Sequence, residues 1–221
     1  MKSLFLTGPP RVGKTTLIAK LISHFIEKHP EISLRGFYTE QVTSTTSGTR
    51  IGFDVITLDG KRGALARKAY NQSVGHSRAN NATQFRVGDY LVDVKEFERL
   101  AIPSVRIDFD KLENAEGEKI DVKDLNKKFL IVIDEIGKME SFSKDFENII
   151  RDLIFDKANI TIDVDHCCIL GTVALKLNYG LAKEIKDAGR LDENVKIWEV
   201  TYQNRNNVND LVKELEIMLK I

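Results

Sequence analysis

The chain has 221 residues, with 33 basic and 33 acidic side chains and a formal net charge of zero. A chain of this length buries a core without disulfide bonds or structural metals, so we expect one domain over residues 1–221. The charge balance gives no strong signal for nucleic acid, although a local basic patch is not excluded by the sum. No apolar run approaches the ~20 residues of a membrane helix and no leader pattern follows Met1. We therefore expect a cytoplasmic protein, with the nucleus as the alternative.

The N-terminal segment predicts a strand, a phosphate-binding loop and a helix in succession. The apolar run Ser3–Leu6 suits a buried parallel strand, and apolar residues at helical spacing run from Thr16 to Lys28. Between them, residues 8–15 read G-P-P-R-V-G-K-T. This pattern, in this context, predicts that the chain binds a nucleoside polyphosphate.

The residue types in this loop match the chemistry of phosphate binding. Gly8 and Gly13 allow the backbone to curl so that successive N–H groups face phosphate oxygens. Lys14 can reach the β- and γ-phosphates, and the Thr15 hydroxyl is placed to ligate Mg²⁺. The helix that follows offers unpaired N–H groups and a dipole that both favour an anion.

An antiparallel meander is predicted after the first helix. Residues 34–40 and 51–58 have strand character, and residues 43–50 between them form a turn rich in Ser, Thr and Gly. Asp59-Gly60 marks a tight turn into a third strand. The meander interrupts a chain that otherwise alternates strands and helices, which predicts an α/β fold with a largely parallel central sheet flanked by helices.

Several stretches are harder to assign. Residues 68–84 are polar without apolar periodicity, so we expect a flexible exposed loop. Residues 85–94 return to strand character, and a helical pattern begins at Lys95. Residues 113–128 are charged and predict a loop, and residues 156–165 predict an insertion.

A second half of the site is predicted where the most apolar strand ends. Residues 129–133 read F-L-I-V-I and are followed by Asp134 and Glu135. A phosphate loop needs a carboxylate across the sheet to hold Mg²⁺, and Asp134 meets that need. An ionised Glu135 beside the γ-phosphate can orient and deprotonate a water molecule. This acidic pair favours hydrolysis of the nucleotide over transfer to another acceptor.

The remaining elements complete the alternation. They are a helix over 143–155, a strand over 167–173, a helix over 181–188, a strand over 195–200 and a helix over 208–219.

Neither the cysteines nor the histidines receive a functional role. Adjacent residues of a strand point to opposite faces, so Cys167 and Cys168 are poorly placed to share a metal ion, and both are expected to be buried apolar fillers. His24, His29 and His76 lie in polar or helix-surface contexts.

Taken together, blocks along the chain resemble the cancer-related nucleoside-triphosphatase family. They are L-F-L-T-G-P-P-R-V-G-K-T-T-L, G-F-Y-T-E at 36–40, R-I-G-F-D-V-I-T-L-D-G at 50–60, R-V-G-D-Y-L-V-D at 86–93, V-I-D-E-I-G-K-M-E at 132–140, I-L-G-T at 169–172 and N-R-N at 204–206. The resemblance spans nearly the whole chain. It implies a RecA-like phosphate-loop fold and slow, Mg²⁺-dependent hydrolysis of several nucleoside triphosphates, including ATP and GTP.

The resemblance also implies residue roles. The phosphate contacts would be Gly8, Pro9, Pro10, Arg11, Val12, Gly13, Lys14, Thr15 and Thr16. Thr15 and Asp134 would organise Mg²⁺, and Glu135, with Lys14, would serve catalysis. Asn204 and Arg205 are candidates for the nucleobase side. Arg50 in R-I-G-F-D and Arg67 in the L-A-R triplet at 65–67 match arginines of the family, and Lys138 falls within the I-G-K-M-E block. Lys176 follows the I-L-G-T block in a stretch that departs from the family pattern. Arg11 also departs from it, because glycine is common at that position.

Two other functions use the same phosphate loop. A kinase acting on a nucleoside, a nucleotide or a polynucleotide end would need an acceptor that this sequence does not reveal. A nucleotide-dependent switch would present residues 68–84 to a partner. No heptad pattern indicates a coiled coil, so we expect a monomer.

Overall fold

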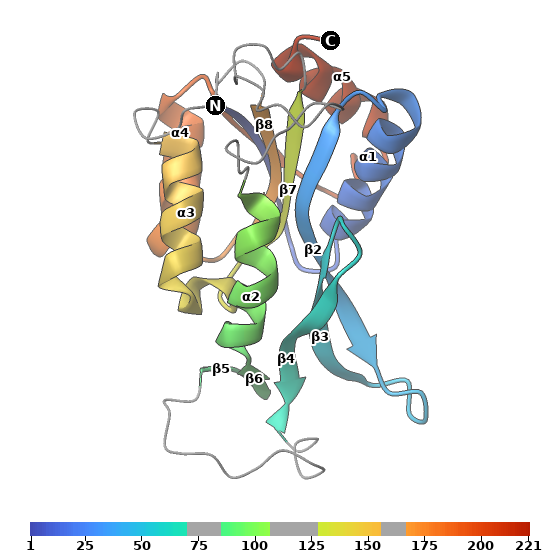
Figure 1. The fold of residues 1–221 in the computed structure, drawn as a ribbon, viewed down its shortest axis with the longest axis vertical. Coiled ribbons are helices and arrows are strands. Elements are labelled where there is room, and N and C mark those ends of the chain that lie inside the picture. The colour runs from blue at the N-terminus through green and yellow to red at the C-terminus, as the bar shows by residue number, and fades with distance from the viewer. Residues whose placement is uncertain (70–84, 107–127, 156–166) are drawn as a thin grey trace, which may run out of the picture.

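The computed structural model describes residues 1–69, 85–106, 128–155 and 167–221. These residues form a nine-stranded sheet covered by helices on both faces (Figure 1). In sheet order the strands are β5 (Arg86–Val87), β6 (Tyr90–Val92), β4 (Arg62–Lys68), β3 (Arg50–Thr57), β2 (Ser33–Thr43), β7 (Phe129–Ile136), β8 (Cys167–Val173), β1 (Lys2–Thr7) and β9 (Val195–Glu199).

Five neighbouring strands of the sheet, β2, β7, β8, β1 and β9, are parallel to one another and form the centre of the fold. Their carboxyl ends therefore meet at one edge of the sheet, where open α/β sheets bind their ligands. β8 lies between β1 and β7, so the strand that leads into the phosphate loop and the strand that ends in Asp134 are second neighbours. This topology places Lys14 and Asp134, which are far apart in the chain, at the same edge.

The other four strands form the meander. β2 pairs antiparallel with β3, β3 with β4, β4 with β6 and β6 with β5. Figure 1 shows β3 and β4 extending beyond the helical layers, below the parallel part of the sheet. The predicted fold class, a largely parallel sheet with an antiparallel meander, is confirmed.

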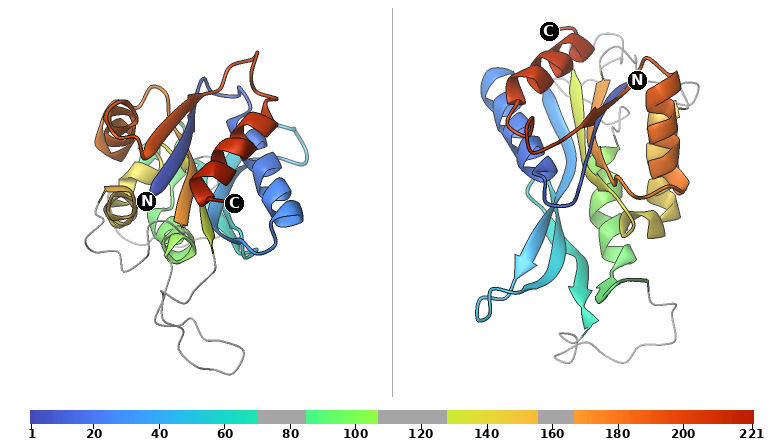
Figure 2. Two further views of the ribbon diagram at one scale, coloured as in Figure 1. Left: turned by 90° about the horizontal axis from the view of Figure 1, so that it is seen from above. Right: turned by 180° about the vertical axis from the view of Figure 1, so that it is seen from behind.

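Helices cover the two faces unequally. They are α1 (Lys14–Lys28), α2 (Val94–Val105), α3 (Lys144–Phe155), α4 (Gly180–Leu191) and α5 (Val208–Leu219). α1 and α5 pack side by side on one face, and α2, α3 and α4 cover the other (Figure 2). Among the described residues, none of the helices has the length and apolar character needed to cross a bilayer.

The parallel strands alternate between two hydrophobic cores. On β7, Phe129, Ile131 and Ile133 join the core beneath α2, α3 and α4, whereas Leu130 and Val132 join the core beneath α1 and α5. The same period of two separates the adjacent cysteines of β8, because Cys167 belongs to the first core and Cys168 to the second. Both thiols are free and buried, as predicted. Burial raises the pKa of Cys167 to about 12, so neither its chemistry nor its geometry suits a reactive site.

The predicted boundaries differ from the structure in one stretch. Residues 85–94 form two short strands around a turn at Gly88, which has φ of +57°, rather than one strand. α2 then begins at Val94, because the Asp93 carboxylate accepts the Glu96 N–H at 3.0 Å and caps the helix. Lys68 lies in β4, and the rest of the predicted 68–84 loop, the predicted 156–165 insertion and most of the 113–128 loop lie outside the described residues.

Gly36 of β2 pairs with Val132 of β7 in the parallel part of the sheet. Its φ is +103°, and a Cβ atom at this position would lie 1.9 Å from the Val132 carbonyl oxygen. Gly48, in the turn after β2, also has a positive φ of +65°, but a Cβ atom there would meet nothing within 4 Å. The two glycines therefore separate the cost of backbone conformation from the cost of a steric clash.

We predict that Gly36→Ala lowers the free energy of unfolding by more than about 4 kcal/mol, because the β2–β7 pairing must open. Gly48→Ala, the matched control, should cost about 1–2 kcal/mol for its left-handed backbone alone. Urea unfolding of both variants measures the difference. Equal losses in the two variants would contradict the close approach of the two strands.

Candidate functional site

The loop between β1 and α1 has the backbone conformation that a phosphate cradle needs. Gly8 and Gly13 have φ of +145° and +112°, values that only glycine adopts readily. A Cβ atom at Gly8 would lie 2.5 Å from the Val200 carbonyl oxygen, so this glycine also permits a close approach of the loop to the segment after β9. Arg11 has φ of +65°, which accounts for a preference for glycine at this position, and its side chain is exposed.

The first turn of α1 begins with backbone N–H groups that have no partner within the helix. The Leu17 N–H donates to the Gly13 carbonyl at 2.9 Å, which begins the helix, and Gly13 provides no side-chain cap. The N–H groups of the first turn of α1, from Lys14 to Thr16, are therefore available to an anion. Pro9, Pro10, Thr15 and Thr16 are exposed around this turn, whereas Val12 is buried and anchors the loop in the core.

The Lys14 ammonium turns back over the loop. It donates a hydrogen bond to the Gly8 carbonyl at 3.2 Å, and its Nζ lies 3.5 Å from the Pro9 carbonyl oxygen. These carbonyls hold the ammonium above the cradle, where a phosphate group would meet it.

Asp134 lies at the carboxyl end of β7 and is 1% exposed. The Thr172 hydroxyl, on neighbouring β8, donates to its Oδ1 at 2.5 Å. On β1, the Thr7 hydroxyl donates to the Val173 carbonyl at 3.1 Å and ties the ends of these strands together. The β7–β8 register shifts between Ile133 and Ile136, and the peptide bond between Asp134 and Glu135 is cis.

The electrostatics of Asp134 connect it to the phosphate loop. Burial raises the pKa of Asp134, whereas the Thr172 and Thr15 hydroxyls and the Lys14 ammonium lower it. Its Oδ2 atom is buried and makes no direct hydrogen bond within the described part of the chain. A carboxylate oxygen that is buried, unpaired and close to a threonine hydroxyl has the donor chemistry of a Mg²⁺ site.

Glu135 and Glu140 add two more carboxyl groups. Burial raises the pKa of Glu135, the Lys14 ammonium lowers it, and the Asp134 charge raises it. Glu140, in a short 3-10 helix (Glu140–Phe142), is buried and accepts the Gly137 N–H at 3.0 Å. Burial, together with the charge of Glu135, raises the pKa of Glu140 to about 8. The structure thus brings Lys14, Thr15, Asp134 and Glu135 into electrostatic contact, with Glu140 behind them.

The loop after β9 adjoins the phosphate loop. A Cβ atom at Gly13 would lie 3.9 Å from the Arg205 side chain, and the Arg205 guanidinium lies 5.4 Å from the centroid of the exposed Tyr202 ring. Asn204 has a structural role, because its Oδ1 accepts the Thr201 N–H at 2.7 Å and its Nδ2 donates to the Glu199 carbonyl at 2.8 Å. These bonds fix the loop that presents Tyr202 and Arg205.

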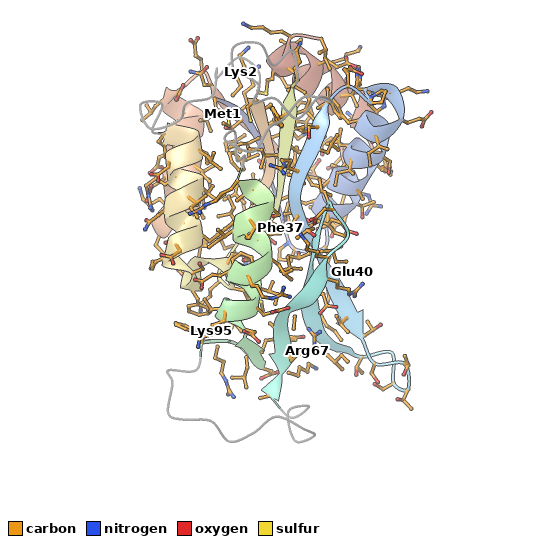
Figure 3. The ribbon with its side chains drawn as sticks, viewed as in Figure 1. Met1, Lys2, Phe37, Glu40, Arg67 and Lys95 are labelled. Carbon is orange, nitrogen blue, oxygen red and sulfur yellow. The ribbon has the colours of Figure 1, made fainter. Side chains whose placement is uncertain are left out.

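The candidate arginines lie in the meander, several strands from β1 in the order of the sheet. Arg67 on β4 forms an ion pair with Asp54 and donates to the Phe53 carbonyl at 2.8 Å, and the Arg50 guanidinium lies 5.3 Å from the Phe53 ring centroid. β4 is five strand positions from β1, roughly 24 Å across a flat sheet. Figure 3 shows Arg67 in the meander, below Glu40 of β2.

The two candidate lysines are exposed on loops at the carboxyl edge. Lys138 follows β7 and Lys176 follows β8. The loop that carries Lys176 is held from α4, because the Lys186 ammonium donates to the Leu175 carbonyl at 3.1 Å and to the Leu177 carbonyl at 2.5 Å.

The sheet order, the glycine-shaped loop and the buried carboxylate across the sheet define a nucleotide-binding protein of the phosphate-loop class. The chain belongs to the NTPase family, whose profile matches residues 3–213. It is similar to the human cancer-related nucleoside-triphosphatase, with 39% identity over 207 residues, which are 94% of this chain and 92% of that protein. Nucleoside-triphosphatase THEP1 of Aquifex aeolicus is 34% identical over 96% of this chain and 98% of its own length.

Solved structures agree. The solution structure of a human cancer-related nucleoside triphosphatase superposes with a TM-score of 0.67 at 37% identity, covering 98% of both chains. The crystal structure of THEP1 from Aquifex aeolicus gives a TM-score of 0.66 at 30% identity, covering 97% of this chain and 99% of that one. The resemblance and the RecA-like phosphate-loop fold inferred from the sequence are confirmed.

Sequence reasoning missed three residues of the site. Thr172 is the hydrogen-bond donor to Asp134, Glu140 is the buried acid behind Glu135, and Tyr202 is the exposed ring beside Arg205. Thr172 and Glu140 close the I-L-G-T and D-E-I-G-K-M-E blocks, so their positions carried a signal. Their partners depend on strand order, which a single sequence does not give.

Glu140 should make the stability of the protein depend on pH. Its pKa in the folded state is about 8, against an ordinary value of 4.5, so between these values the folded state keeps a proton that the unfolded chain releases. The free energy of unfolding therefore falls as the pH rises from about 4.5 to 8, by at most about 1.4 kcal/mol per pH unit from this group.

We predict that Glu140→Gln, which mimics the protonated side chain, removes this contribution. The stability of the variant relative to the wild type should increase from about pH 5 to about pH 8, as measured by urea unfolding without nucleotide or metal. Asp134 and Glu135 also have raised pKa values and are present in both proteins, so the difference between the two profiles reports Glu140 together with its coupling to these acids. Parallel pH profiles for the two proteins would contradict the buried, protonated state of Glu140.

Proposed function

We propose that this chain is a Mg²⁺-dependent nucleoside-triphosphatase that hydrolyses ATP, GTP and other nucleoside triphosphates to the diphosphate and phosphate. The human and Aquifex aeolicus relatives are named nucleoside-triphosphatases, and they cover nearly the whole of this chain. The observation that carries the proposal here is the position of Asp134 and Glu135 opposite Lys14, because it supplies a metal ligand and a base at the phosphate end of one cradle.

Thr15 and Asp134 are the residues that would hold Mg²⁺. Their hydroxyl and carboxylate oxygens suit this ion, and the buried Oδ2 of Asp134, which has no hydrogen-bond partner among the described residues, supports the assignment. When bound, Mg²⁺ neutralises charge on the β- and γ-phosphate oxygens. The Thr172 hydroxyl keeps the carboxylate oriented by holding its other oxygen.

Glu135 is the proposed general base. Burial raises the pKa of Glu135 towards the range in which a carboxylate accepts a proton from water most effectively, while the Lys14 ammonium favours the ionised form that a base requires. Glu135 would orient a water molecule for in-line attack and take its proton. Lys14 and the N–H groups at the start of α1 would stabilise the charge on the phosphate oxygens.

The loop after β9 supports broad acceptance of nucleobases. Tyr202 is 63% exposed beside Arg205, next to Gly13 of the phosphate loop. Stacking on an aromatic ring or a guanidinium tolerates every base, because every base has a π face. We therefore assign Tyr202 and Arg205 to the base side and Asn204 to holding the loop.

Initial rates of phosphate release from γ-labelled ATP, GTP, CTP and UTP test the proposal, measured with Mg²⁺ and with and without added nucleosides. We expect label in inorganic phosphate for every nucleotide, at rates that nucleosides do not change. Label on the nucleoside would identify a kinase and contradict the assignment. Phosphate release that does not require a divalent cation would contradict the metal site.

We predict that Glu135→Gln retains nucleotide binding but lowers kcat by on the order of 10²–10⁴-fold, because the amide cannot accept the proton. Fluorescent-nucleotide binding and phosphate release measure the two effects separately. Glu193→Gln, which changes an exposed glutamate in the same way, should match the wild type in both. Lys14→Ala should instead weaken binding and turnover together. A Glu135→Gln protein with wild-type turnover would remove Glu135 from the mechanism.

A further inference from the structure

A second group of ligand-type side chains lies at the far end of α1 from the phosphate loop. His24 on α1, His29 at its C-terminal cap and Glu216 on α5 each offer one ligand atom, and these atoms all lie within 4.8 Å of one another. Along α1, His24 lies about 15 Å and His29 about 22 Å from Lys14. Figure 2 shows α1 and α5 packed side by side here.

The charges around His29 favour a cation. Its Nδ1 lies 3.2 Å from Glu31 Oε1 and its Nε2 lies 3.3 Å from Glu216 Oε1, so a carboxylate faces each ring nitrogen. A neutral imidazole has only one N–H, which leaves a lone pair facing one of the carboxylates. A metal ion on the ring, or a second proton, would replace this repulsive contact with an attractive one.

His24 distinguishes the two possibilities. Its Nε2 atom is buried and has no hydrogen-bond partner within the described part of the chain. A second proton on His29 would leave this nitrogen unsatisfied, which is costly for a buried polar atom. A metal ion among the three side chains would satisfy His24, His29 and Glu216 together.

The geometry is close to that of a tetrahedral site. With metal–ligand bonds of about 2.0–2.2 Å, neighbouring donor atoms of tetrahedral Zn²⁺ lie about 3.3–3.5 Å apart. The 3.3 Å between His29 Nε2 and Glu216 Oε1 already matches, and the distances to His24, which are within 4.8 Å, must close by at most about 1.5 Å.

The surroundings of His29 also fit a metal ligand. Its backbone is fixed on both sides, because its N–H donates to the Phe25 carbonyl and its carbonyl accepts the Ile32 N–H, each at 3.0 Å. Glu31 would orient the ring through Nδ1–H, as carboxylates commonly do for histidines that bind metals.

We propose that His24, His29 and Glu216 form a transition-metal site, best suited to Zn²⁺, that ties the C-terminal end of α1 to α5. Two imidazoles and one carboxylate suit Zn²⁺ rather than Mg²⁺ or Ca²⁺, which prefer oxygen ligands. Three protein ligands leave the fourth position to water. The site is independent of the nucleotide chemistry at the other end of the helix.

Titration of the metal-stripped full chain with Zn²⁺ tests the proposal, with excess Mg²⁺ present to occupy oxygen-ligand sites. Calorimetry should give one saturable equivalent per chain. The imidazole ¹⁵N resonances of His24 and His29 should shift in the wild-type protein, and Co²⁺ should give the visible bands of a tetrahedral site. Absence of saturable Zn²⁺ binding at micromolar concentration would overturn the proposal, as would binding that leaves both rings unperturbed.

Variants then assign the ligands. His24→Gln, His29→Gln and Glu216→Gln should each weaken Zn²⁺ binding by more than about 100-fold, and Glu31→Gln by about 10–100-fold. Glu193→Gln is the matched control, because this glutamate is exposed beyond α4 and is not part of the cluster, so the affinity of this variant for Zn²⁺ should be unchanged. Circular dichroism and nucleotide binding verify that each variant is folded. Full affinity in folded His29→Gln would also overturn the proposal.

Discussion

The site depends on one buried carboxylate. Removing the charge of Asp134 from water is costly, and the structure offsets that cost with the Thr172 hydroxyl, the nearby Thr15 hydroxyl and the Lys14 ammonium. One carboxylate oxygen is held by Thr172, and the other has no direct hydrogen bond to any residue that the structure describes. Because Thr172 holds only Oδ1, the negative charge of Asp134 is available to a ligand at Oδ2. The phosphate loop and the end of β7 also depend on each other, because the Lys14 ammonium and the Asp134 carboxylate compensate each other's charge.

The parallel sheet is the feature that brings these groups together. β8 lies between β1 and β7, and its Thr172 hydroxyl binds Asp134 at the end of β7. In the phosphate loop, Gly8 allows a close approach to the backbone at Val200. A third acid, Glu140, lies near Asp134 and Glu135. Burial raises the pKa of Glu140 to about 8, which leaves a neutral carboxyl group beside the proposed base. The arrangement places the Lys14 ammonium, the proposed metal ligand Asp134 and the proposed base Glu135 close together at the carboxyl edge of the sheet. At the other end of α1, the proposed zinc ligands join the same helix to the last helix of the chain.

The sequence predicted the parts of the site that depend on local patterns. The phosphate loop, the apolar strand that ends in Asp134-Glu135, the meander and the terminal helix were all found from spacing and periodicity. It did not predict Thr172 as the partner of Asp134, because that contact depends on β8 lying between β1 and β7. His24 and His29 received no role because their sequence context is polar or helix-surface, and their neighbour Glu216 lies on the last helix, far along the chain. Arg67 stays a prediction: it matches an arginine of the family, and in the structure its guanidinium forms an ion pair with Asp54 within the meander.

The role of Asp134 is tested most directly by the effect of Mg²⁺ on nucleotide affinity in the wild type and in Asp134→Asn. Asparagine keeps the shape and the oxygen that accepts the Thr172 hydroxyl but loses the charge. Binding of a non-hydrolysable ATP analogue, measured with Mg²⁺ and with a chelator, should be strengthened by Mg²⁺ in the wild type and not in the variant. Equal strengthening in both proteins would show that the buried carboxylate does not hold the metal.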